Sequence, residues 1–373
     1  MMYLKKIVMA LLVALLLPLL SCNADTQKDN LSFCYWKTSF RFSPTEHTTW
    51  TETGANHLYI RYFDVDWNED AQMAMPIETI WVTDTLPCAY FTPCVFLTNR
   101  VFEKSSTQQL DTLSLRIKKR ILNSSQSFAQ WLYYARQKEY YSRDSDELKH
   151  LLAQFEGRYS DILIDCDWTE KTKDKFFYFL KQLKKDFSDK EITATLRLWQ
   201  YKQQEKAGIP PVKRCLLMCY NMQTANNYKV ENSIASLSEL QKYVSGKQYP
   251  LKLDLALPIF HWAVLFRNER FVGLLGEVAK ADLDNNIIEY QSIGNNRYRL
   301  IVDKVIGNFF ARNGDEVRVE MITDKDLEQM IDYLKKNINF DKQSRITLFS
   351  WNELYIKNYG TNEIKNIFTA FSK

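Results

Sequence analysis

The sequence predicts an α/β fold, a (β/α)8 TIM-type barrel with a small β-rich insertion between strands seven and eight. Short apolar runs with strand character recur along the chain, and segments with helical spacing separate them, which is typical of parallel βα units. Their number, eight, is the number of strands that closes such a barrel. The predicted strands span residues 31–37, 57–66, 88–97, 161–167, 192–199, 214–220, 251–260 and 345–351.

The segments between the predicted strands support helices. Apolar residues recur at helical spacing over residues 176–187, after the fourth strand, with lysines on the other face. Helical patterns also cover residues 110–122 and 147–155, between the third and fourth strands. A helix from Thr323 to about Lys336 begins with a capping signal and leads into the last strand.

Residues 264–322 break the alternation of strands and helices. They are rich in Ile, Val, Tyr and Phe, and turn sequences such as Asn313-Gly314-Asp315 interrupt them. We predict a small β-rich insertion here, within one barrel domain that spans residues 31–373. In a barrel it would lie beside the mouth, where functional loops gather, although irregular surface loops without a role would give a similar pattern.

The first residues have the pattern of a bacterial lipoprotein signal. Lys5 and Lys6 precede an apolar run over residues 7–20, and Leu-Leu-Ser-Cys closes that run at Cys22. The run is shorter than the ~20 apolar residues of a membrane-spanning helix and ends at a small residue before the cysteine. We therefore predict a signal peptide over residues 1–21 and lipid, including palmitate, on Cys22.

The residues that follow Cys22 predict how the protein is attached. Residues 22–30 are polar and lack periodic hydrophobicity, as a flexible tether does. A lipidated cysteine with several acyl chains anchors a protein to a membrane that it does not cross. We expect a membrane-anchored lipoprotein of the bacterial envelope. Asn23 stands where an Asp would retain the protein at an inner membrane, which favours the outer membrane.

The composition favours some functions over others. The chain has 49 Lys and Arg against 45 Asp and Glu, and the basic residues are spread along it, so nucleic acid is not an expected partner. The six cysteines beyond Cys22 and the four histidines lack metal-ligand spacing, and no metal or other cofactor is expected. Most of these cysteines lie in apolar runs, which favours buried, reduced thiols.

Polar side chains follow the apolar part of several predicted strands. Asp165 and Asp167 end the fourth strand on one face, and Tyr220 and Asn221 end the sixth. The carboxyl ends of barrel strands form the face where active sites lie, and acids, polar donors and rings together suit a sugar-binding cleft. The residues predicted to bind substrate are Asp64, Asp165, Asp167, Tyr220, Asn221 and Trp351.

These strand ends resemble the chitinase-type barrel of glycoside hydrolase family 18 and divergent bacterial lipoprotein families related to it. The resemblance is carried by Asp-x-Asp-Trp at the end of strand four, Met-x-Tyr-Asn at the end of strand six and the Trp of strand eight. The motifs are short and are spread over most of the mature chain. The resemblance implies that Asp167 orients the N-acetyl group of a substrate and that Tyr220 helps to hold that group.

One departure from that family bears on catalysis. The family has its acid, a Glu, two residues beyond the second aspartate, where this chain has Thr169. A hydroxyl cannot protonate a leaving glycosidic oxygen as a carboxylic acid does, and we predict that Thr169 caps the next helix. Glu170 would serve as the catalytic acid only if a bulge turned it into the mouth. Asn221 also replaces the more usual Asp.

These observations predict a glycoside-hydrolase-like barrel that binds glycan and has lost catalysis. One alternative is an active glycoside hydrolase that uses Asp167 with Glu170 or another acid. Another is a non-catalytic scaffold that binds a protein partner within an envelope complex. The expected partners are a glycan and, through the lipid anchor, the membrane.

Overall fold

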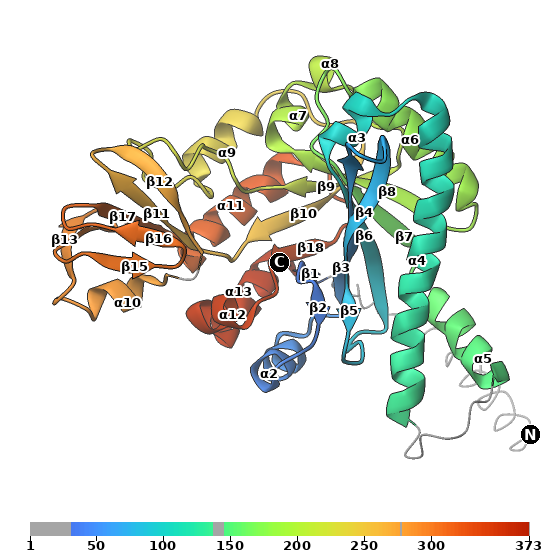
Figure 1. Cartoon of the computed structure of the whole chain (residues 1–373), viewed down its shortest axis with the longest axis horizontal. Coiled ribbons are helices and arrows are strands. Elements are labelled where there is room, and N and C mark those ends of the chain that lie inside the picture. Colours follow the sequence, from blue (N-terminus) through green and yellow to red (C-terminus); the bar gives the residue numbers. More distant parts are fainter. Residues whose placement is uncertain (1–30, 137–144, 277, 373) are drawn as a thin grey trace, which may run out of the picture.

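The computed structural model describes residues 31–136, 145–276 and 278–372 (Figure 1). The predicted signal peptide, Cys22 and the tether lie outside the described residues. Within those residues, no helix combines the length and the apolar character that crossing a membrane requires.

Eight parallel strands form a closed barrel, which confirms the predicted fold class. Each strand is hydrogen-bonded to the next, and β1 pairs with both β18 and β3, so the sheet has no open edge between them. Every predicted strand is present, within a few residues of its expected ends. The strands are β1 (Leu31–Tyr35), β3 (His57–Asn68), β6 (Tyr90–Leu97), β7 (Asp161–Asp165), β8 (Glu191–Arg197), β9 (Arg214–Met218), β10 (Lys252–Pro258) and β18 (Ile346–Phe349).

Helices surround the barrel, with α4 the longest of those described (Figure 1). Thr323 caps α11 together with Asp326, as the sequence predicts. The N-terminal part of the chain also forms the short strands β2 (Ser39–Phe40) and β5 (Trp81–Val82), and β4 (Met73–Thr79), which is antiparallel to β3. The helices are α2 (Pro44–Thr53), α3 (Asn99–Lys104), α4 (Thr107–Arg136), α5 (Ser145–Glu156), α6 (Lys173–Asp186), α7 (Leu198–Lys202), α8 (Gln204–Ala207), α9 (Leu237–Tyr243), α11 (Asp324–Asn337), α12 (Glu353–Tyr359) and α13 (Thr361–Ser372).

The segment between β10 and β18 forms a separate antiparallel sheet, on the left in Figure 1. Its five strands lie in the order β12-β11-β17-β14-β13, and they enclose a hydrophobic core of their own. The predicted insertion is therefore β-rich, as expected. Its elements are β11 (Trp262–Arg267), β12 (Arg270–Leu275), α10 (Lys280–Asp284), β13 (Tyr290–Gly294), β14 (Arg297–Leu300), the hairpin of β15 (Lys304–Ile306) and β16 (Phe309–Ala311), and β17 (Glu316–Glu320).

A buried ion pair joins this insertion to the loop between β9 and α9. Arg318 and Glu320 are both fully buried and lie 2.5 Å apart. Arg318 also donates to main-chain carbonyls of that loop, including Ala225 at 2.8 Å, and Glu320 accepts from the main-chain N–H of Ser233 at 2.7 Å. Because that loop follows β9 directly, the insertion holds one of the loops at the carboxyl end of the barrel.

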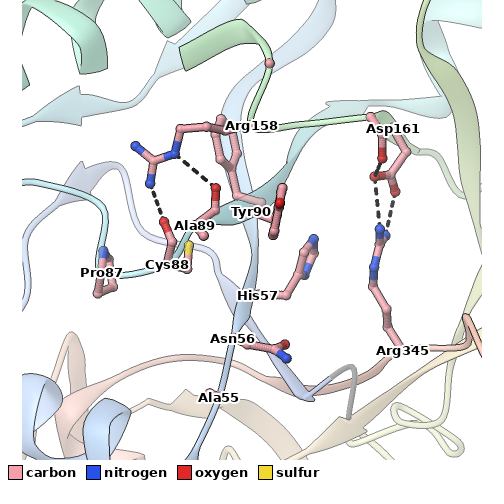
Figure 2. Close-up of a pocket in the computed structure, with 13 residues that line it drawn as sticks. Ala55, Asn56, His57, Pro87, Cys88, Ala89, Tyr90, Arg158, Asp161 and Arg345 are labelled. Carbon is pink, nitrogen blue, oxygen red and sulfur yellow. Dashed lines mark hydrogen bonds and ion pairs between the residues drawn. The ribbon is translucent and has the colours of Figure 1, made fainter. Parts of the chain in front are cut away.

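A polar network closes the opposite, amino-terminal end of the barrel, which we call the floor. Arg345, just before β18, donates to Asp161 at 2.6 Å, as Figure 2 shows. Asp254 accepts from the main-chain N–H of Arg345 at 2.9 Å, from the Tyr59 hydroxyl at 2.8 Å and from Arg214 at 3.0 Å. Buried charges are tolerated when they are paired and hydrogen-bonded in this way.

The six cysteines in the described residues are free and buried, as the sequence predicts. Burial raises the pKa of the Cys34 and Cys88 thiols to about 12. They therefore stay protonated and act as small apolar side chains in the core.

Candidate functional site

A cavity of about 240 Å³ opens at the carboxyl ends of the barrel strands. We call it the mouth cavity. It brings together five of the six residues predicted to bind substrate: Asp64, Asp165, Asp167, Tyr220 and Asn221. Its lining also includes Trp36, Arg61, Arg197 and Phe349, which that prediction left out.

Asp165 is the last residue of β7 and is buried at the bottom of this arrangement. Its carboxylate accepts a hydrogen bond of 2.7 Å from the Thr195 hydroxyl on the neighbouring strand β8. Burial raises the pKa of Asp165 to about 6, and the negative charge of Asp167 acts in the same direction. The mouth cavity thus contains a carboxyl group that titrates near neutral pH.

Asp167 lies two residues further along and is paired with Arg197 from the end of β8. The two guanidinium nitrogens Nε and Nη2 donate to its two carboxylate oxygens at 2.5 and 2.8 Å. Such two-point pairs between arginine and carboxylate are among the stronger and more specific polar contacts. Both oxygens of Asp167 are therefore already engaged, and Arg197 fixes the direction of the carboxylate.

Asp64 is held in the same manner from the other side of the mouth. Arg61, on the same strand β3, donates to Asp64 Oδ1 at 2.6 Å and contacts Oδ2 with its Nη2 atom. The guanidinium also reaches Glu78 on β4 at 2.8 Å. Two of the three aspartates that line the mouth cavity, Asp64 and Asp167, are thus paired with an arginine.

Tyr220 presents an aromatic face and a hydroxyl to the mouth cavity. Its ring stacks on Phe349 with 4.9 Å between ring centroids and meets Phe260 edge to face at 5.8 Å. Burial holds its pKa well above the ordinary value, so the phenol remains protonated. Tyr220 lines the mouth cavity, where a protonated phenol can donate a hydrogen bond to a ligand.

Asn221 follows Tyr220 with a backbone φ of 53°, in the left-handed region that asparagine tolerates better than most residues. This conformation turns the chain out of β9 and into the loop held by the insertion. It places an amide, which can both donate and accept, beside the phenol of Tyr220.

Trp351 does not lie at the mouth, contrary to the prediction. It is fully buried outside the barrel wall, where its ring lies 4.3 Å from Phe33, 5.2 Å from Phe42 and 6.0 Å from Trp50. The prediction took Trp351 as the end of strand eight, but β18 ends at Phe349, two residues earlier. Phe349 is the ring that strand eight supplies there instead. The sequence signal that could have identified Phe349 is its position as the last apolar residue of the strand, directly before the polar Ser350.

Thr169 and Glu170 lie outside the lining of the mouth cavity. Helix α6 begins only at Lys173, with Thr172 in the N-cap position, so the predicted cap at Thr169 is wrong. Thr169 instead shapes the turn before the helix: its main-chain N–H donates to the Thr172 hydroxyl at 2.9 Å. Glu170 lies on that turn and its side chain is exposed to solvent.

Among the described residues, no group of three or more His, Cys, Asp or Glu side chains could hold a metal ion. The side chains of the mouth are two carboxylates fixed by arginines, one buried carboxyl with a raised pKa, a protonated phenol, an amide and aromatic rings.

No protein-family model matches the chain, and no curated protein matches its sequence. Among solved structures, a xylanase and α-amylase inhibitor protein from Scadoxus multiflorus is 7% identical, with 92% of this chain and 97% of that chain covered and a TM-score of 0.37. A fungal endo-β-N-acetylglucosaminidase of glycosyl hydrolase family 18 is 10% identical, with 91% and 97% covered and a TM-score of 0.38. A putative chitinase A from Streptomyces coelicolor is 9% identical, with 92% and 100% covered and a TM-score of 0.36. At these identities the barrel is established by the strand pairing of this chain itself.

Proposed function

We propose that this chain is an envelope lipoprotein whose barrel binds a glycan at the mouth cavity without cleaving it. The observation that carries the proposal concerns the two positions where a catalytic carboxyl group would be expected, Asp167 and Thr169. Asp167 has both oxygens bound by Arg197, and Thr169 stands where the hydrolase family that the strand ends resemble has its acid. Glycoside hydrolysis needs one group to protonate the leaving oxygen and a second to act as nucleophile or base. The Thr169 hydroxyl cannot be that acid, and the two-point pairing with Arg197 makes the Asp167 carboxylate a weaker nucleophile or base.

The remaining groups of the mouth suit recognition of a sugar. Phe349 and Trp36 contribute apolar ring surface to the cavity for a sugar, and the Tyr220 hydroxyl and the Asn221 amide offer hydrogen bonds. The cavity volume of about 240 Å³ is below the roughly 300–1,000 Å³ of most small-molecule sites. We therefore expect recognition of one sugar unit, such as a terminal residue of a longer glycan.

Replacing Tyr220 with Phe is expected to weaken glycan binding about tenfold, since one hydrogen bond contributes roughly 0.5–1.5 kcal/mol. The ring and its stacking on Phe349 remain, so the free energy of unfolding should change little. A glycan array identifies the ligand, and titration calorimetry then measures the affinity of the wild type and of Y220F. In the control, Tyr178→Phe, an exposed hydroxyl on α6 that donates to Asp111 is removed, and the affinity should not change. Equal affinities of wild type and Y220F, or no ligand among envelope, host and dietary glycans, would contradict the proposal.

One observation favours the alternative of an active glycoside hydrolase. Asp165 has a pKa of about 6, raised by burial, which is the range in which a general acid works at neutral pH. If Asp165 is that acid, oligosaccharide turnover should be measurable and should fall by at least a hundredfold in Asp165→Asn, roughly the lower limit for loss of an acid–base group. No turnover of N-acetylglucosamine-containing or neutral oligosaccharides by the wild type would exclude this alternative.

The anchoring half of the proposal has its own test. When the full chain with its leader is expressed in a bacterium, labelled palmitate should be incorporated and the protein should fractionate with membranes. Cys22→Ser should abolish both, since it removes the only side chain in the signal that can accept the lipid. Cys34→Ser, which changes a buried thiol of β1, is the matched control and should keep both. Label that persists in C22S would disprove anchoring through Cys22.

A further inference from the structure

The tether that follows the lipid anchor proposed above would join the barrel at the end opposite the mouth cavity. Leu31 is the first residue of β1, and all eight barrel strands are parallel, so it lies at the amino-terminal end together with the floor. Eight residues separate Cys22 from Leu31, and even fully extended they span only roughly 30 Å. A lipid on Cys22 therefore keeps the amino-terminal end of the barrel close to the membrane. On its own, this tether would still let the barrel turn.

The same end of the barrel carries an excess of positive charge. Two cavities of about 510 and 700 Å³ open there, and they share Ser160, Asp161 and Arg345. We call their combined lining the basic face. Six cationic side chains line it against three carboxylates: Arg158, Lys213, Arg214, Lys252, Lys342 and Arg345 against Asp161, Glu191 and Asp341. At the mouth cavity the balance is reversed, since two arginines face three aspartates.

The arginines and the lysines of the basic face differ in what they contact. Arg345 is bound to Asp161, and Arg158 donates to the main-chain carbonyl of Ala89 across the cavity, as Figure 2 shows. They form the rigid part of the face. Two of the lysines are exposed: Lys342, and Lys213, whose side chain is 80% exposed and pairs with Glu191 at 2.9 Å. The Lys252 ammonium donates to a neutral partner, the Asn339 amide oxygen, at 3.0 Å.

We infer that the basic face docks on the anionic phospholipid headgroups of the membrane that holds the anchor, so that the mouth cavity points away from the membrane. The tether limits the distance between the barrel and the membrane, and the positive charge of the basic face sets the orientation of the barrel. Three lysines that line one cavity can approach headgroup phosphates together, whereas the lining of the mouth cavity has more aspartates than arginines. The attraction acts over about one Debye length, roughly 10 Å at 0.1 M salt. A glycan-binding mouth would then face the space beyond the membrane.

Charge-dependent binding is tested without the lipid. The mature chain carrying Cys22→Ser is sedimented with vesicles of phosphatidylglycerol and phosphatidylcholine in equal parts, and with vesicles of phosphatidylcholine alone. We expect binding to the mixed vesicles only, weakening as salt is raised. Each lysine near such a surface contributes roughly fivefold to partitioning, so Lys213→Gln, Lys252→Gln and Lys342→Gln together should reduce it by about a hundredfold. The matched triple variant at the mouth end, Lys171→Gln, Lys202→Gln and Lys206→Gln, removes three exposed lysines and should bind as the parent does.

The orientation is tested on the lipidated protein. Because the six other cysteines of the mature chain are buried, one added cysteine can be labelled selectively. A fluorophore on Lys213→Cys should be quenched by quenchers attached to the lipid headgroups, and one on Lys202→Cys at the mouth end should not. Equal quenching at the two positions, or equal vesicle binding by the two triple variants, would overturn the inference. Mass spectrometry of lipidated Cys22 in the same samples shows whether the anchor is present. A failed orientation with lipid present therefore rejects this inference and not the anchoring.

Discussion

Glu320→Ala should lower the free energy of unfolding by about 3–5 kcal/mol, the range for removing one partner of a fully buried ion pair. Arg318 would keep its positive charge in a fully buried position without its carboxylate. The main-chain N–H of Ser233 and the indole N–H of Trp262 would lose their acceptor as well. Urea unfolding followed by circular dichroism measures the loss.

The surface pair on α12 provides the control for Glu320→Ala. Lys357 and Glu353 are 59% and 38% exposed, so Lys357→Ala should cost no more than about 0.5 kcal/mol. Replacing both members of the buried pair with apolar residues, Arg318→Met and Glu320→Leu, should recover much of the stability, because no charge is then left buried without a partner. A loss below about 1 kcal/mol in E320A would mean that the pair does not hold the insertion to the barrel.

Arg345→Met is expected to destabilise the barrel by about 2–4 kcal/mol at neutral pH, somewhat less than for a fully buried pair because the arginine side chain is 20% exposed. Methionine keeps much of the length of the side chain but leaves Asp161 without its two guanidinium contacts. The positive charge that favours ionised Asp254 would also be lost. Urea unfolding at several pH values measures the effect.

The destabilisation by Arg345→Met should depend on pH in a defined direction. Burial raises the pKa of Asp254 above its ordinary value of 3.8, and Arg345 and Arg214 oppose that rise. Without Arg345 the pKa of Asp254 rises further in the folded state. A carboxyl whose folded pKa is raised costs stability as pH climbs from its unfolded pKa through its folded pKa. The difference between R345M and wild type should thus be smallest below about pH 4 and grow towards neutral pH.

A lysine of the basic face provides the control for Arg345→Met. It shows whether the loss of any positive charge at this end of the barrel would destabilise the protein. Lys213 is 80% exposed and pairs with Glu191 at 2.9 Å, so Lys213→Met should change the free energy of unfolding by less than about 0.5 kcal/mol at any of these pH values. A destabilisation by R345M that is independent of pH would show that lost packing, not lost charge, explains it.

The sequence by itself determined the architecture of the barrel and the strand ends that form its mouth. Eight apolar runs separated by helical patterns are a local signal, because strand alternation and helix spacing are properties of the backbone. The same alternation placed Asp165 and Asp167 on one face, and both line the mouth cavity. The predicted insertion rests on a local signal too, namely β-branched and aromatic residues between turns.

Only the tertiary structure decided what the side chains at the mouth are free to do. Arg197 lies thirty positions beyond Asp167 in the chain, and no local pattern shows that it occupies both oxygens of that carboxylate. Trp351 was misplaced because the predicted strand ran to residue 351, whereas β18 ends at Phe349. The pairing of charges, their burial and the ends of strands all depend on contacts between segments distant in sequence. The sequence therefore named the groups at the mouth, and the fold determined which of them a ligand can reach.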